Sequence, residues 1–241
     1  MADECCSKGL TRRQWLNASA GLGLAAGEAA AAPRVNIHAA EPPPASADEA
    51  LSRLKAGNRR FMEGRAKHTH ENASWRHMLV EGQRPFATIL GCSDSRVPPE
   101  LVFDVGLGEL FIARLAGNII AEDVVGTLQY AIAHLHTPLV VVLGHEGCGA
   151  VTAAVDDMLH ANHEPSHIEA LLRLIEPGLA KVDLKQERDA LLKAAVEANV
   201  RWSMKQLVAV PEGERAIRDG KVTLVGAVYE LASGNVRFLS R

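Results

Sequence analysis

Residues 139–149 read Leu-Val-Val-Val-Leu-Gly-His-Glu-Gly-Cys-Gly. The five apolar residues at the start, bounded by Pro138, predict a short buried strand of the kind found in parallel sheets. The glycines that follow predict a turn, and apolar residues at helical spacing through Leu159 predict a helix after it. The stretch therefore predicts a strand–turn–helix unit that carries His145 and Cys148 on its turn.

The remainder of the chain repeats this alternation of apolar strands and amphipathic helices. We predict further strands at residues 86–90, 110–115, 222–231 and 236–239, and further helices at residues 47–63, 123–136, 166–175 and 186–208. Such alternation indicates βαβ units. The predicted fold is therefore α/β, with a mainly parallel four-stranded sheet, an antiparallel edge strand, and helices on both faces.

A second chemistry-bearing segment, Gly91-Cys92-Ser93-Asp94-Ser95-Arg96, follows the predicted strand at residues 86–90. Ligands of open α/β sheets bind beyond the carboxyl ends of the strands, which is where this segment and His145 are expected. Two thiolates and one imidazole, from Cys92, Cys148 and His145, form a set that leaves a fourth zinc position free, as in catalytic sites. Zinc lowers the pKa of bound water from 15.7 to about 7.

Asp94 and Arg96 are two residues apart, so on extended backbone their side chains share one face. A carboxylate fixed by a guanidinium stays ionised and oriented, and it can direct a zinc-bound hydroxide toward a substrate. Alternatively, Asp94 takes the fourth zinc position itself and closes the site to water. A closed site of this kind would also suit a structural zinc.

The composition restricts the class of protein. A chain of 241 residues fits one folded domain, and its net charge of −3 with 4% aromatic residues argues against a nucleic-acid partner. No apolar run is long enough to span a bilayer, so no stable membrane insertion is expected. His68 and His70 lie in a polar stretch and are predicted to be exposed loop histidines rather than metal ligands.

The N-terminal residues are predicted to be a targeting segment rather than part of the folded domain. Residues 11–16, Thr-Arg-Arg-Gln-Trp-Leu, resemble a twin-arginine export signal, and an Ala/Gly-rich stretch and Pro42-Pro43-Pro44 follow. We therefore expect a signal segment and linker at residues 1–45 and a catalytic domain at residues 46–241. The expected location is periplasmic or otherwise exported, or cytoplasmic if the N-terminus is not processed.

The two motifs together resemble the β-class carbonic anhydrases, as do Gly108-Glu109-Leu110-Phe111, Arg114 and Ala116-Gly117-Asn118. The resemblance covers about residues 46–240. It implies one Zn²⁺ per subunit on Cys92, His145 and Cys148, and a catalytic dyad of Asp94 and Arg96. It also implies that Gln83 contacts bicarbonate across a dimer interface. The remaining implied substrate-binding residues, which wall the pocket, are Phe111 and Tyr130.

The implied activity is that of a lyase that hydrates carbon dioxide reversibly to bicarbonate and a proton, through attack of zinc-bound hydroxide. The implied assembly is a homodimer or a dimer of dimers with the active site at the interface. Two departures stand out: Leu115 replaces an asparagine found in many members, and Ile89 replaces the tryptophan of allosterically inhibited members. The second favours an open site with Asp94 paired to Arg96.

Two rival hypotheses remain at this point. One is a hydrolase that uses the same site on carbon disulfide or carbonyl sulfide, which are linear molecules like carbon dioxide. The other is a non-catalytic zinc protein that senses bicarbonate or redox state. The rival hydrolase would differ in its rates on the three substrates, and the sensor would hold zinc without hydration activity.

Overall fold

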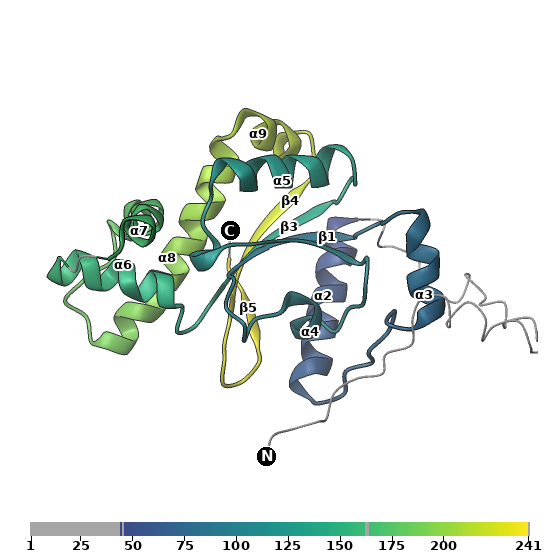
Figure 1. Ribbon diagram of the computed structural model, residues 1–241, viewed down its shortest axis with the longest axis horizontal. Helices are drawn as coiled ribbons and strands as arrows, with labels where there is room; N and C mark the ends of the chain where they lie inside the picture. The colour runs from purple at the N-terminus through teal and green to yellow at the C-terminus, as the bar shows by residue number, and fades with distance from the viewer. Residues whose placement is uncertain (1–43, 45, 162–163, 241) are drawn as a thin grey trace, which may run out of the picture. The chain divides into compact units, whose positions relative to one another are not determined.

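The computed structural model describes residue 44, residues 46–161 and residues 164–240, and a five-stranded sheet lies at their centre (Figure 1). The strand order is β2-β1-β3-β4-β5, in which β5 alone is antiparallel to its neighbour. The predicted α/β architecture with an antiparallel edge strand is confirmed, with five strands in all rather than four. The strands are β1 (Ala87–Gly91), β2 (Leu110–Arg114), β3 (Leu139–His145), β4 (Thr223–Tyr229) and β5 (Val236–Phe238).

The long helices lie where the apolar periodicity predicts them, whereas the short ones were not predicted. An element of four to eight residues is too short to show a helical repeat, so α3, α4 and α9 gave no clear signal. The helices are α2 (Ala47–Met62), α3 (Ala73–Met78), α4 (Pro99–Val102), α5 (Glu122–Ala133), α6 (Gly149–His160), α7 (Ser166–Leu179), α8 (Arg188–Ala209) and α9 (Pro211–Arg218), with 3₁₀ turns η2 (Leu79–Glu81) and η3 (Ala116–Asn118).

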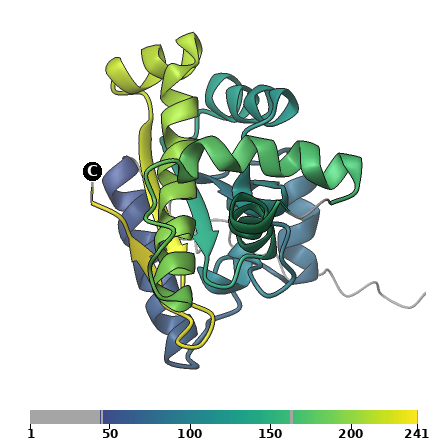
Figure 2. The same ribbon diagram turned by 90° about the vertical axis from the view of Figure 1, so that its left-hand side faces the viewer.

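Helices cover the two faces of the sheet (Figures 1 and 2), and an apolar layer lies on each face. Side chains alternate between faces along a strand, so Ile89 and Val141 pack with Leu54 of α2 in one layer. Leu90 and Val142 face the other layer, which is built by α5, α6, α7 and α8. Because both faces are covered, the inner strands β1 and β3 are buried along their whole length, and their ends are left for chemistry.

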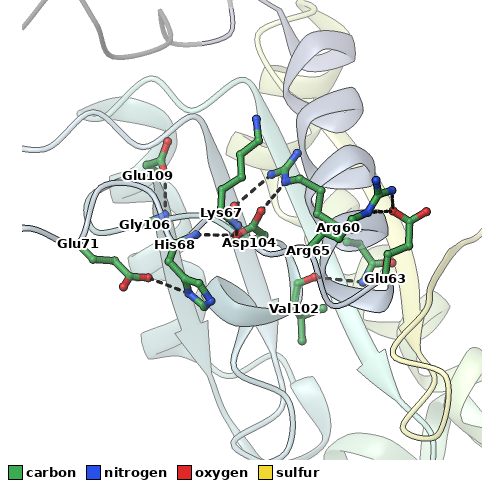
Figure 3. Close-up of polar contacts among 11 residues, drawn as sticks. Arg60, Glu63, Arg65, Lys67, His68, Glu71, Val102, Asp104, Gly106 and Glu109 are labelled. Carbon is green, nitrogen blue, oxygen red and sulfur yellow. Dashed lines mark hydrogen bonds and ion pairs between the residues drawn. The ribbon is translucent and has the colours of Figure 1, made fainter.

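The segment between α2 and β1 is tied to the loop after α4 by one buried carboxylate (Figure 3). Asp104 pairs with Arg60 and accepts hydrogen bonds from the backbone N–H groups of Lys67 and His68, at 2.8 and 3.3 Å. His68 is exposed, as predicted. His70 is not: its side chain stacks on Trp75, with ring centroids 3.8 Å apart, and only 16% of it is accessible.

The predicted export signal lies outside the described residues, so export remains a prediction. Among the described residues, no helix has the length and apolar character needed to cross a membrane.

Candidate metal centre

Three buried donor side chains converge at the carboxyl edge of the sheet. Cys92 directly follows β1, His145 is the last residue of β3, and Cys148 is the N-cap of α6. The Sγ atoms of the two cysteines are 3.9 Å apart, and the ligand atoms of all three residues lie within 4.8 Å of one another. No other group of three metal-binding side chains this close occurs in the part of the chain that the structure describes.

The imidazole of His145 is oriented as a metal ligand. Its Nδ1 lies 2.8 Å from the carbonyl oxygen of Glu146, so Nδ1–H donates and the lone pair resides on Nε2. Nε2 is fully buried and has no hydrogen-bond partner among the described residues. A buried nitrogen left unpaired beside two sulfurs is costly, and a cation that binds all three atoms removes that cost. The set fits zinc, which prefers sulfur and nitrogen donors in a tetrahedral arrangement.

The two cysteine thiols interact, so each shifts the pKa of the other. The hydrogen bond from Cys148 lowers the pKa of Cys92 to about 4, with help from the Gly117 N–H at 3.3 Å, although burial opposes the shift. The same pairing, together with burial, raises the pKa of the Cys148 thiol. Ionisation of one sulfur therefore disfavours ionisation of the other, and a metal bound to both would displace the remaining proton.

Asp94 and Arg96 form a bidentate ion pair beside the three donors. Arg96 donates from Nε to Asp94 Oδ1 at 2.9 Å and from Nη2 to Oδ2 at 2.7 Å, and its backbone N–H also donates to Oδ1. These side-chain hydrogen bonds hold the pKa of Asp94 well below its usual range. Oδ2 lies 3.8 Å from His145 Nε2, so this oxygen faces the metal-binding atoms.

Arginine side chains also fix the loop that carries Cys92 and Asp94. Arg114 donates from Nε to the carbonyl oxygen of Cys92 at 2.9 Å and from Nη2 to that of Asp94 at 2.6 Å. Arg96 Nη2 reaches the carbonyl oxygen of Gly147, at 3.3 Å, on the turn that holds Cys148. In the sequence Arg114 stands out only as part of a motif. Its hydrogen bonds to the loop after β1 depend on the pairing of β1 with β2, which places Arg114 opposite Gly91.

Comparisons with known proteins agree with this geometry. The family model described as "Carbonic anhydrase" matches residues 87–236, which include every residue of the metal centre. The chain belongs to the carbonic anhydrase family. Carbonic anhydrase 2 of Mycobacterium tuberculosis is 36% identical over 189 residues, covering 75% of this chain and 87% of that protein. A carbonic anhydrase of Mycolicibacterium smegmatis is 34% identical over 195 residues, covering 78% and 90%.

Solved structures place the chain in the β class of this family. The β-carbonic anhydrase CcaA has a TM-score of 0.64 at 26% identity, over 80% of this chain and 100% of that one. The β-carbonic anhydrase of Coccomyxa, solved with acetazolamide, has a TM-score of 0.63 at 26% identity, over 79% and 86%.

The substrate-binding residues predicted from the β-class carbonic anhydrases lie away from the metal centre of their own chain. Gln83 is exposed and precedes β1, whereas Cys92 follows it, so a five-residue strand, about 16 Å long, lies between them. Phe111 pairs with Thr88 near the start of β1. Tyr130 lies in the last turn of α5, 6.1 Å from the Phe111 ring. The structure thus groups Phe111 with Tyr130 but joins neither to the metal ligands.

Proposed function

We propose that this chain catalyses the reversible hydration of carbon dioxide to bicarbonate and a proton, with zinc held by Cys92, His145 and Cys148. The observation that carries the proposal is the buried sulfur–nitrogen–sulfur set with an oriented carboxylate beside it. A zinc ion bound there would supply a water of lowered pKa and polarise the substrate. The fourth position is left open by the three protein donors, as catalytic zinc requires.

The residues of the chain orient the reactants. Asp94 Oδ2 faces the metal-binding atoms and can accept a hydrogen bond from the attacking water, which fixes the direction of its lone pair. Arg96 keeps the carboxylate ionised and in place through two side-chain hydrogen bonds, one to each oxygen. Arg114 donates a hydrogen bond to the carbonyl oxygen of Asp94 and so holds the Asp94 backbone, which preorganises the carboxylate before substrate arrives.

Metal analysis and stopped-flow hydration kinetics on the full chain test the proposal together. We expect about one zinc per chain and rapid hydration of carbon dioxide, which is lost on chelation and restored by zinc. Carbon disulfide and carbonyl sulfide serve as comparison substrates. Faster turnover of either would assign the site to the rival hydrolase, and zinc without any turnover would favour the sensor.

We further propose that the active unit is at least a homodimer, in which Gln83, Phe111 and Tyr130 serve the metal centre of the partner chain. Their distance from Cys92 in the same chain supports this proposal. The solved enzymes of Sordaria macrospora, a fold match at 23% identity and a TM-score of 0.65, are described as tetrameric β-carbonic anhydrases.

A mixing experiment tests the sharing of sites. Gln83→Ala and Cys148→Ala chains, each expected to be nearly inactive alone, are unfolded together, refolded with zinc and assayed. Random pairing makes half of the dimers hybrid, each with one intact site, so about a quarter of the normal activity should return. Recovery of no activity by the mixture, with hybrid dimers demonstrated by mass spectrometry, would contradict the shared site.

We also propose export through the twin-arginine route, supported by Arg12-Arg13 within the signal-like stretch. Replacement of both arginines by lysine should shift the protein from the periplasmic to the cytoplasmic fraction. Equal distribution of the unmodified and the lysine variants would argue against the route.

A further inference from the structure

The turn that donates a hydrogen bond to the Cys92 sulfur has an unusual backbone conformation. η3 contains Gly117 with a φ of 69° and ends in Asn118 with a φ of 44°. Glycine adopts left-handed backbone freely, but the conformation is uncommon for other residues, so Asn118 needs outside support. The turn is adjacent to the metal centre, because the Gly117 N–H lies 3.3 Å from Cys92 Sγ.

That support comes from two buried side chains on α8, some eighty residues further along the chain. Asn199 Nδ2 donates to the carbonyl oxygen of Gly117 at 2.7 Å. Ser203 Oγ donates to the carbonyl oxygen of Asn118 at 2.9 Å and lies 3.3 Å from Asn118 Nδ2. Asn199 and Ser203 are four residues apart, so they lie on one face of the helix and hold consecutive peptide groups.

Packing alone does not explain why the residue at position 199 is an asparagine. Asn199 is 1% exposed, and its Oδ1 has no hydrogen-bond partner among the described residues. A buried polar atom without a partner opposes folding, and a leucine of similar size would avoid that penalty. The hydrogen bond that Asn199 makes to Gly117 is thus the feature that an apolar residue at this position would lack.

We propose that Asn199 is a positioning residue for the metal centre, which acts by holding the Gly117 N–H against the sulfur of Cys92. Ser203 assists by fixing the next peptide group. The inference rests on the proposed zinc site and adds a residue whose hydrogen bond goes to the Gly117 carbonyl oxygen rather than to a metal ligand. Hydrogen bonds from outside the ligand set orient ligands and tune their donor strength, and losing one costs about 10–100-fold in metal affinity or activity.

The test uses the full chain, stripped of metal, with Asn199→Leu and a matched control, Gln206→Leu. Gln206 is also on α8 and, within the part of the chain that the structure describes, also has a buried amide atom without a partner and makes no hydrogen bond to η3. Zinc affinity is measured by competition with a chromophoric chelator. Cobalt substitution reports the sulfur-to-cobalt charge-transfer band, which is sensitive to thiolate geometry.

We expect Asn199→Leu to bind zinc about tenfold or more weakly and to shift the cobalt band, while Gln206→Leu stays close to the unmodified chain. In the metal-free protein, the Gly117 amide should exchange faster in Asn199→Leu. Unchanged zinc affinity and an unchanged band in folded Asn199→Leu would overturn the inference. If the variant does not fold, Ser203→Ala carries the test: a smaller loss of affinity is expected, and none would overturn it.

The outcomes separate the inference from the proposed function. An unmodified chain that binds neither zinc nor cobalt would overturn both. Tight binding by the unmodified chain and by Asn199→Leu alike would overturn the positioning role and leave the zinc site standing.

Discussion

Replacing Asp94 by asparagine should leave zinc bound and remove most of the turnover. The amide has one acceptor oxygen where the carboxylate has two. In the structure Oδ1 accepts two hydrogen bonds from Arg96, through its backbone N–H and Nε, and Oδ2 accepts one from Nη2. The amide oxygen will therefore keep the Oδ1 position, where it satisfies two donors rather than one. The NH₂ group then takes the place of Oδ2, the atom that faces His145 Nε2.

This exchange reverses the hydrogen-bonding role of the atom that faces the metal centre. An acceptor becomes a donor, the negative charge is lost, and the NH₂ group opposes the Nη2 donor of Arg96. Loss of one preorganised group at a reacting centre costs about 10²–10³-fold in rate, and we expect a fall of that order in kcat/KM. Stopped-flow hydration with parallel zinc analysis measures it.

The matched control is Asp156→Asn, which removes a carboxylate paired with Arg188, at 2.7 Å, on the surface between α6 and α8. It should hydrate carbon dioxide at the normal rate. A kcat/KM for Asp94→Asn within a factor of about three of the unmodified value, with zinc fully bound, would remove Asp94 from the mechanism.

Three further predictions concern the metal and the fold. Cys148→Ala should lose zinc and activity together, and full zinc content by metal analysis would refute its role as a ligand. Asn58→Ala should lower the free energy of unfolding, measured by urea titration, by about 3–5 kcal/mol. The substitution leaves the carbonyl oxygens of Val102 and Gly234 and the Val236 N–H without their buried partner. A loss below about 1 kcal/mol would contradict this prediction. Burial raises the pKa of Asp104, but hydrogen bonds from Arg60 and two backbone N–H groups outweigh burial and leave the pKa lowered. The ionised Asp104 carboxylate therefore stabilises the folded protein above about pH 4, and this contribution is lost as the pH falls through the lowered pKa. Asp104→Asn, which suits the φ of 45°, should flatten the acid side of the stability profile, and an equally steep decline would refute the assignment.

The sequence was sufficient for the sheet and for the neighbourhood of the metal centre. Runs such as residues 139–143 are long, apolar and bounded by Pro or Gly, so they predict buried strands with little ambiguity. The carboxyl ends of parallel strands share an edge, so Cys92 and His145 are expected at that edge, and the pairing of β1 with β3 then brings them together. The turn glycines and the helix after them predict that Cys148 lies on the turn beside His145.

Sequence patterns do not predict the hydrogen bonds that support the turn beside the metal centre. Asn199 and Ser203 are polar residues within a helix whose pattern shows no reason for them, and their partners lie in a turn some eighty residues earlier. The left-handed conformation at Asn118 had only a weak local signal, since asparagine tolerates that region without requiring it. Such contacts depend on how α8 crosses the sheet, which local periodicity does not specify.

The proposed roles of the site residues place metal binding and substrate recognition at different positions in the chain. The three donors are buried at the carboxyl edge of the sheet, held by contacts within one chain. Gln83 and Tyr130 are exposed near the opposite edge, and in the proposed dimer they serve the metal centre of the partner chain. A change that weakens association should therefore lower turnover while zinc stays bound, whereas a change at Asn199 should weaken zinc binding while association is unaffected. Zinc content and oligomeric state, measured on the same samples, separate these two failures.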